Sequence, residues 1–191
     1  MDKSVIAAIP GHWLIGRLSL EGTRIQEALN DAGTDFLRLS DVEVHAPAKR
    51  ECVSKQPEVI VPKCKLEFAV IPTSEHEAPE KRWNNRTARA VFKAFVTVGQ
   101  CAISGHLHLP SKPADSQYTL VHQLGRFFAL TEATFSFSGH GGTQLGAPLL
   151  FVNRDLVSCL HVDPVQPDVG IGRSTPDGGD VQLCSPHGSP L

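Results

Sequence analysis

The chain has 191 residues, of which 41% are hydrophobic and 20% charged, and it carries a formal net charge of −2 at pH 7. This composition is typical of an ordinary globular protein, and the length accommodates two small domains with modest cores. The near-neutral charge disfavours binding of nucleic acid through an overall basic surface. The apolar runs are far shorter than the roughly 20 residues that span a bilayer, and no targeting signal is apparent. We therefore expect a cytoplasmic protein without membrane insertion.

The first half of the chain has the period-two alternation of short β-strands. Between the second and third of them, a polar stretch carries Ile25 and Leu29 at helical spacing, which predicts one or two helical turns. The predicted strands lie within residues 5–9, 14–20, 35–44 and 59–71.

The second half shows the same kinds of segment in the same order. Strands are predicted near residues 92–98, 103–109 and 126–135, with a helical segment around Tyr118–Gly125 before the last of these. The long apolar run Leu149–Val162 is interrupted by Asn153-Arg154-Asp155, which predicts two strands joined by a tight turn.

The two halves also align residue by residue. AAIPGHWLIGRLSL, from Ala7, lies over VTVGQCAISGHLHL, from Val96, at a shift of 89 residues, and the later blocks align at a shift of 91. Three blocks in the same order, including matches between polar residues and glycines, predict a tandem duplication of one domain. The pairs include Gly16 with Gly105, Phe36 with Phe127, Asp41 with Glu132, Lys63 with Arg154, and Leu66 with Val157.

Four or five short strands in about 70 residues bury enough surface only as a small closed or half-closed barrel. We therefore predict a mainly β fold with two tandem Sm-like or SH3-like small β-barrels, each with a short helical insert. Residues 1–78 would form the first barrel, 79–92 a basic linker, 93–162 the second barrel and 163–191 a flexible Pro/Gly-rich tail. We expect Gly16 and Gly105 at strand bends, Phe36 and Phe127 in equivalent core positions, and burial of Leu18, Leu39, Leu66, Leu107, Leu130 and Val157.

These segments resemble the Sm-like family of small β-barrels. FVTVGQCAISGHLHL, from Phe95, is similar to the first signature of that family, and LLFVNRDLVSCLHV, from Leu149, is similar to its second. The nucleotide-holding Asp-x-x-Asn element is missing after HLHL, and Asn153-Arg154-Asp155 replaces the Arg-Gly of the second signature. The resemblance therefore implies architecture and edge-to-edge ring formation, of which two fused barrels would supply a part. Leu29-Asn30 followed by Phe36-Leu37-Arg38-Leu39 is also similar to short uncharacterised bacterial domains.

Few residues suggest a chemical site. His106 and His108 are placed to share one strand face, as two metal ligands would, but no acidic or cysteine partner is nearby in sequence. His140 lies in a glycine-rich loop that lacks the spacing of a phosphate-binding motif. Because no dense catalytic signature is present either, we expect no enzyme, no metal and no cofactor.

The cysteines suggest neither a disulfide framework nor a zinc knuckle, because they are odd in number, widely spaced and never in a CxxC pair. Cys101 and Cys159 fall on apolar strand faces, where we expect them in the core. The full set is Cys52, Cys64, Cys101, Cys159 and Cys184.

The linker combines basic residues with an aromatic residue, in a pattern that fits either a solvated connector or a docking site for a partner. We predict that it binds a partner through Lys81, Arg82, Trp83, Arg86 and Arg89.

The function we expect is that of a non-enzymatic, self-associating or scaffold component of a larger bacterial protein assembly, a homo-oligomer or larger complex that acts through protein contacts. The alternative is an RNA or single-stranded nucleic-acid binding protein that uses the barrel surface and the basic linker. A small-ligand sensor that uses the variable loops is a third hypothesis.

Overall fold

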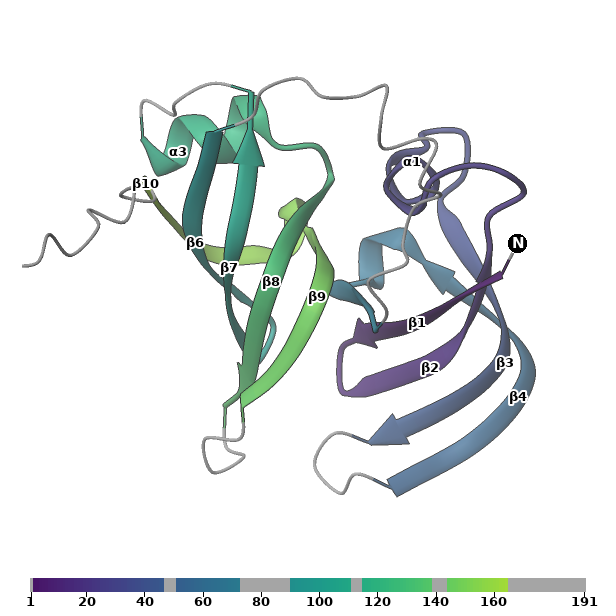
Figure 1. Ribbon diagram of the computed structural model, residues 1–191. Helices are drawn as coiled ribbons and strands as arrows, with labels where there is room; N and C mark the ends of the chain where they lie inside the picture. The colour runs from purple at the N-terminus through teal and green to yellow at the C-terminus, as the bar shows by residue number, and fades with distance from the viewer. Residues whose placement is uncertain (1, 47–50, 73–89, 111–114, 139–143, 165–191) are drawn as a thin grey trace, which may run out of the picture.

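The computed structural model describes residues 2–46, 51–72, 90–110, 115–138 and 144–164 (Figure 1). These residues are mainly in β-strands, which confirms the mainly β part of the predicted fold class. No helix among them is long and apolar enough to cross a membrane.

The first half begins with a hairpin that turns at Gly11, whose φ of +76° suits a glycine. A short helix separates the second strand from the third, and a 3₁₀ turn separates the fourth from the fifth. The elements are β1 (Asp2–Ile9), β2 (His12–Ser19), α1 (Ile25–Asn30), β3 (Phe36–Ala46), β4 (Glu51–Pro62), η1 (Lys63–Lys65) and β5 (Phe68–Ile71).

The second half has the same order of strands, and its helical segment continues from α3 into a π-helical turn, η2. The predicted tight turn at Asn153-Arg154-Asp155 is confirmed, because a 3₁₀ turn begins at Arg154 and separates the last two strands. The elements are β6 (Ala90–Val98), β7 (Cys101–Leu109), α3 (Ser116–Tyr118), η2 (Thr119–Gln123), β8 (Phe127–Phe137), β9 (Gln144–Asn153), η3 (Arg154–Leu156) and β10 (Val157–Pro164).

All ten strands belong to one antiparallel sheet with the order β10-β6-β7-β8-β9-β5-β1-β2-β3-β4. The sheet does not close, because β10 pairs only with β6 and β4 pairs only with β3 among the described strands. Within each half the fifth strand lies beside the first, and the fourth strand lies at the opposite edge. The finer expectation of two separate small barrels stays a prediction.

Strand register follows the shifts read from the sequence. Val5 pairs with Gly16 as Ala94 pairs with Gly105, 89 residues later. Leu39 pairs with Val59 as Leu130 pairs with Leu150, 91 residues later. The two halves therefore repeat their pairing partners as well as their strand order.

A bulge explains why two glycines and two acidic residues recur. The register between the second and third strands slips beside Gly16 and again beside Gly105. Asp41 and Glu132 are the extra residues, with φ of +50° and +49°. A Cβ on Gly105 would approach the Ala133 Cα at 3.2 Å. The bulge thus requires a small residue on one strand, which confirms both predicted bends.

Most of the predicted core is correct, and the errors share one cause. Leu18, Leu39, Leu66, Leu107 and Leu130 are buried as expected, and Cys101 is buried too. By contrast, Val157 is only partly buried, Cys159 is exposed and Phe36 is 45% exposed. Val157 and Cys159 lie on the edge strand β10, and Phe36 lies on β3 next to the edge strand β4, so that no further strand or half of the chain covers these positions.

Several predicted features lie outside the described residues. They are the linker residues 79–89, the loop with His140, and the tail beyond residue 164.

Candidate assembly interface

The two halves join through the edges of two strands. β5 of the first half pairs antiparallel with β9 of the second, so that the sheet continues from one half to the other (Figure 1). Backbone pairing of this kind satisfies polar groups that each edge would otherwise expose to water. The pairs are Phe68 with Val152, Ala69 with Phe151, Val70 with Leu150, and Ile71 with Leu149.

Asn30 ties α1 to the second half. Its Nδ2 donates to the carbonyl oxygen of Phe127 at 2.8 Å, and its Oδ1 accepts from the backbone N–H of Phe127, also at 2.8 Å. One side-chain amide therefore satisfies both backbone groups of the first residue of β8.

Asn153 makes the reciprocal connection from the end of β9. Its buried Nδ2 donates to the carbonyl oxygens of Lys63 at 3.1 Å and Leu66 at 2.9 Å. Its backbone N–H donates to the carbonyl oxygen of Glu67 at 3.0 Å. These contacts fix where β9 meets the turn before β5, and they leave no donor of this buried amide unpaired.

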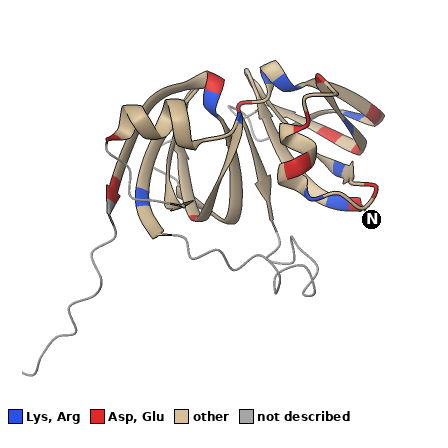
Figure 2. Ribbon diagram, turned by 90° about the horizontal axis from the view of Figure 1, so that it is seen from above, with Lys and Arg blue, Asp and Glu red and all other residues tan. Residues whose placement is uncertain are grey.

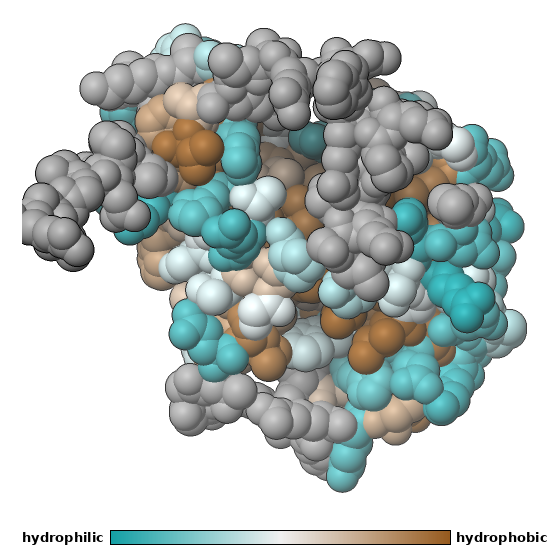
Figure 3. All heavy atoms as spheres, in the orientation of Figure 1, coloured by the Kyte–Doolittle hydropathy of each residue, from teal (hydrophilic) through white to brown (hydrophobic). Residues whose placement is uncertain are grey.

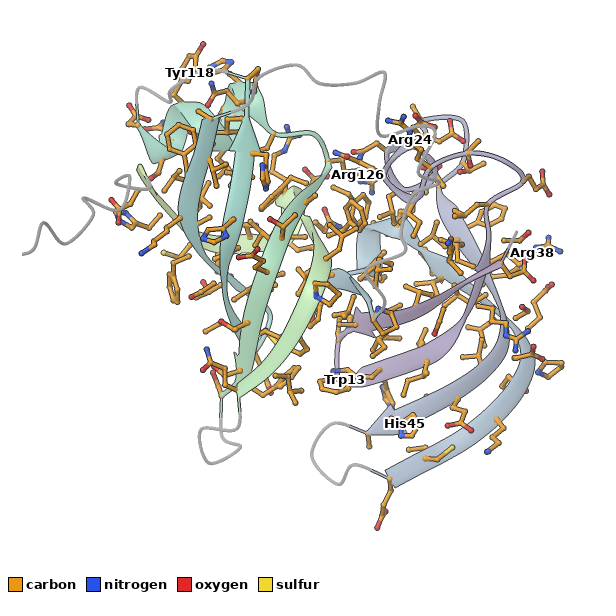
Figure 4. The ribbon with its side chains drawn as sticks, in the orientation of Figure 1. Trp13, Arg24, Arg38, His45, Tyr118 and Arg126 are labelled. Carbon is orange, nitrogen blue, oxygen red and sulfur yellow. The ribbon has the colours of Figure 1, made fainter. Side chains whose placement is uncertain are left out.

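Apolar side chains from the second half complete the core of the first. Phe127, which is 0% exposed, packs with Leu149 and Phe151 among the core residues of the first half. In the other direction, the ring centroid of Trp13 lies 4.6 Å from that of Phe137. Figure 4 shows Trp13 on the side of the first half that faces the second. The junction is thus a shared core as well as a backbone ladder.

A cation at the end of the fourth strand holds the helical segment of each half. Lys63 is fully buried, and its Nζ donates to the carbonyl oxygens of Ala28 and Asp31, both at 2.8 Å. Burial lowers the pKa of Lys63. In the second half the Arg154 Nη1 donates to the carbonyl oxygen of Leu124 at 2.9 Å. The aligned Lys63 and Arg154 therefore have the same role.

The outer edge at β4 is the exposed counterpart of β9. Phe36 is 45% exposed where Phe127 is 0% exposed, and Ile60 is 54% exposed where the aligned Phe151 is 3% exposed. Figure 3 shows apolar residues reaching the surface of both halves among hydrophilic ones. Ile60 on β4 and Phe36 on the neighbouring strand β3 are thus large apolar side chains that the repeated geometry buries in the second half.

The opposite outer edge, β10, is the exposed counterpart of β5. Leu66, Phe68, Ala69 and Ile71 are all at most 1% exposed, because β9 and its side chains cover them. Their aligned residues are more open: Cys159 is exposed, and Val157, Leu160 and Val162 are partly buried.

The two histidines that the sequence suggested as metal ligands have different partners in the structure. His106 Nδ1 lies 3.2 Å from the Glu132 carboxylate, in the place of the pair between Arg17 and Asp41. His108 Nε2 lies 2.9 Å from the Thr131 hydroxyl instead. The predicted partner-binding residues Lys81, Arg82, Trp83, Arg86 and Arg89 lie outside the described residues.

Sequence reasoning missed the two asparagines as interface residues. Their signal was a polar amide directly after an apolar residue, at the end of the apolar run Leu149–Val152 for Asn153 and at the end of the predicted helical turns for Asn30. A separate feature of the junction is a cleft of about 570 Å³ between the two halves. It is lined by Arg24 of the first half and by His108, Gln123 and Phe128 of the second.

Comparison of the chain with known proteins gave no match to a protein-family model, to a curated protein or to a solved structure.

Proposed function

We propose that the protein is a non-enzymatic, self-associating component of a larger assembly, in which edge β4 of one chain pairs with edge β10 of the next. The junction between β5 and β9 carries the proposal, because it already joins a fifth strand to a fourth strand. The free edges β10 and β4 are the fifth and fourth strands of their own halves. A second copy would therefore offer each free edge the kind of strand that the junction uses.

The junction also supplies a register for this contact. Each residue of the junction is replaced by its aligned residue in the other half, 91 positions later for β5 and 91 positions earlier for β9. This places Leu160 opposite Ile60, Cys159 opposite Val61 and Val162 opposite Glu58. We call residues 58–61 of β4 the pairing segment. Its most exposed apolar residue is Ile60, which antiparallel pairing in this register would cover. Full burial of such a side chain contributes about 1.5–3 kcal/mol, and because Ile60 is 54% exposed the contact would contribute about half of that.

The helical segments support the same arrangement. Asn30 lies against Phe127 in the junction, and the aligned pair at the contact between chains is Val121 and Phe36. Val121 is 55% exposed and Phe36 is 45% exposed. A polar contact inside the chain would thus be replaced by an apolar contact between chains, which buries both side chains.

The contact between chains should be weaker than the internal junction. Pro62 takes the place of Asn153, so the edge lacks both the amide side chain and the backbone N–H that anchor β9. Two different surfaces meet in this contact, so it is heterologous and generates rings or open filaments. We expect reversible, concentration-dependent assembly into multiples of one chain.

Light scattering during size-exclusion chromatography tests the proposal. The wild-type mass should rise above that of one chain with concentration, and Ile60→Lys should reduce it to one chain. Val53→Lys is the matched control, because Val53 is 60% exposed on the same strand but outside the pairing segment. A wild-type protein that stays a single chain at every concentration would rule the proposal out.

Disulfide trapping tests the register. Ile60→Cys with Leu160→Cys, in a background whose cysteines other than buried Cys101 are changed to serine, should form a disulfide between chains on mild oxidation. Glu58→Cys with Leu160→Cys displaces the pair by two residues and should cross-link poorly. Equal trapping of both pairs would contradict this register.

The basic linker belongs to the same proposal as a second contact. The triple change of Arg82, Trp83 and Arg86 to Ala should leave each half folded and weaken assembly.

Basic and acidic residues are interspersed along the described chain (Figure 2). Retention on heparin that falls steeply with salt, together with an unchanged mass, would instead favour the nucleic-acid alternative.

A further inference from the structure

The β3–β4 hairpin gathers three side chains whose chemistry differs from that of the assembly edges. Glu43 and His45 lie on β3, and Cys52 lies opposite His45 on β4. One ligand atom from each residue lies within 4.8 Å of the other two. This is the one such group of three or more His, Cys, Asp and Glu residues in the part of the chain that the structure describes.

We propose that Glu43, His45 and Cys52 bind one divalent cation of the zinc class. A carboxylate, an imidazole and a thiolate are a ligand set that favours zinc or cobalt over magnesium and calcium. Three protein ligands leave the fourth tetrahedral position to water.

The distances suit a single ion. His45 Nε2 and Glu43 Oε2 are 3.2 Å apart. Two ligand atoms about 2.1 Å from a tetrahedral ion are about 3.4 Å apart, so both can bind one ion with little movement. Cys52 is exposed, and its Sγ has only a weak contact with the Ser54 carbonyl oxygen at 3.5 Å. The sulfur is therefore free to rotate toward the other two ligands.

The charge around the group modulates the site. Lys55 forms an ion pair with the Glu43 oxygen that does not face His45. This hydrogen bond, followed by that from His45, lowers the pKa of Glu43. The carboxylate is therefore ionised at neutral pH, while the ammonium of Lys55 opposes an incoming cation.

The second half indicates that the fold does not require these residues. The positions aligned with Glu43 and His45 hold Thr134 and Ser136, in the same strand and register. The glycines, acidic residues and cations of the bulges and helix ends recur in both halves, whereas this ligand set does not. Its presence in one hairpin therefore has a cause other than strand geometry.

The experiment titrates Co²⁺ and then Zn²⁺ into the reduced, chelator-treated full chain. We expect one Co²⁺ per chain with a thiolate-to-cobalt charge-transfer band, and displacement of Co²⁺ by Zn²⁺. Cys52→Ser should abolish the band, and His45→Asn should weaken binding at least tenfold, as expected for loss of one ligand of three.

Two further variants make the test specific. Cys64→Ser removes another exposed thiol and should leave the band unchanged. Lys55→Gln should tighten binding severalfold, because it removes the opposing charge without removing a ligand. Absence of a thiolate band in the wild type, or its survival in Cys52→Ser, would overturn the proposal. Circular dichroism of each variant separates loss of a ligand from loss of the fold.

Discussion

The fourth strands of the two halves, β9 and β4, pair with their third strands in the same register but have different surroundings. β9 is covered on its other edge by β5, and its residues Phe151 and Val152 are buried. β4 has no second partner in the described sheet, and Ile60 is 54% exposed. The comparison teaches that burial here depends on the neighbouring strand more than on the residue itself.

The largest expected difference is between the two aligned phenylalanines. Phe127→Ala should lower the free energy of unfolding by about 3–5 kcal/mol, because it empties a fully buried position. Phe36→Ala should cost less than about 1 kcal/mol in the single chain, because the ring is half exposed. Urea denaturation at low protein concentration measures both. Equal costs would mean that the two environments differ less than the structure indicates.

Next in size is the effect of the buried amide of Asn153. Asn153→Ala leaves the carbonyl oxygens of Lys63 and Leu66 without their donor, and should destabilise the chain by about 2–4 kcal/mol. The reciprocal variant, Pro62→Asn, should leave unfolding nearly unchanged and tighten self-association, because it restores the missing donors at the free edge. A Pro62→Asn protein that assembles less well than wild type would speak against the proposed contact.

A smaller effect is expected at the bulge. Gly105→Ala places a Cβ 3.2 Å from three atoms of β8 and should cost about 1–3 kcal/mol. Gly146→Ala is the control, since a Cβ there meets nothing within 4 Å, and its effect should stay within about 0.5 kcal/mol. Thermal unfolding followed by circular dichroism distinguishes the two. A tolerated Gly105→Ala would show that the bulge relaxes.

The smallest expected effect is a difference in reactivity between two thiols, those of Cys101 and Cys159. Burial, with the nearby Glu67 as a lesser cause, raises the pKa of Cys101 to about 12. Its thiolate is therefore scarce at neutral and mildly alkaline pH, and iodoacetamide should leave Cys101 unmodified in the folded protein. Cys159 is exposed and should react. Peptide mass spectrometry measures both, and assembly through β10 should slow the reaction of Cys159.

The sequence predicted correctly the features that depend on contacts within one half of the chain. Gly16 and Gly105 were predicted at bends because alternation continued through a residue without a side chain, and both lie at bulges. Leu39 and Leu130 were predicted to be buried from strand phase alone, and both are 0% exposed.

The errors arose where burial depends on the other half. Val157, Cys159 and Phe36 have apolar neighbours in sequence. Their exposure, however, depends on which strand edge of one half pairs with which strand edge of the other. That pairing is a long-range property which period and composition do not encode. The cluster of Glu43, His45 and Cys52 was missed for a similar reason. Only the hairpin register brings Cys52 opposite His45.

The repetition of strand order and register within one chain has a consequence for the symmetry of the proposed assembly. A ring or filament built from identical single domains repeats its surface at every position, whereas one built from this chain repeats it only at every second position. The number of domains is then always even, and features confined to one half alternate around the assembly. Such an assembly could present two different kinds of surface in strict alternation without requiring two genes.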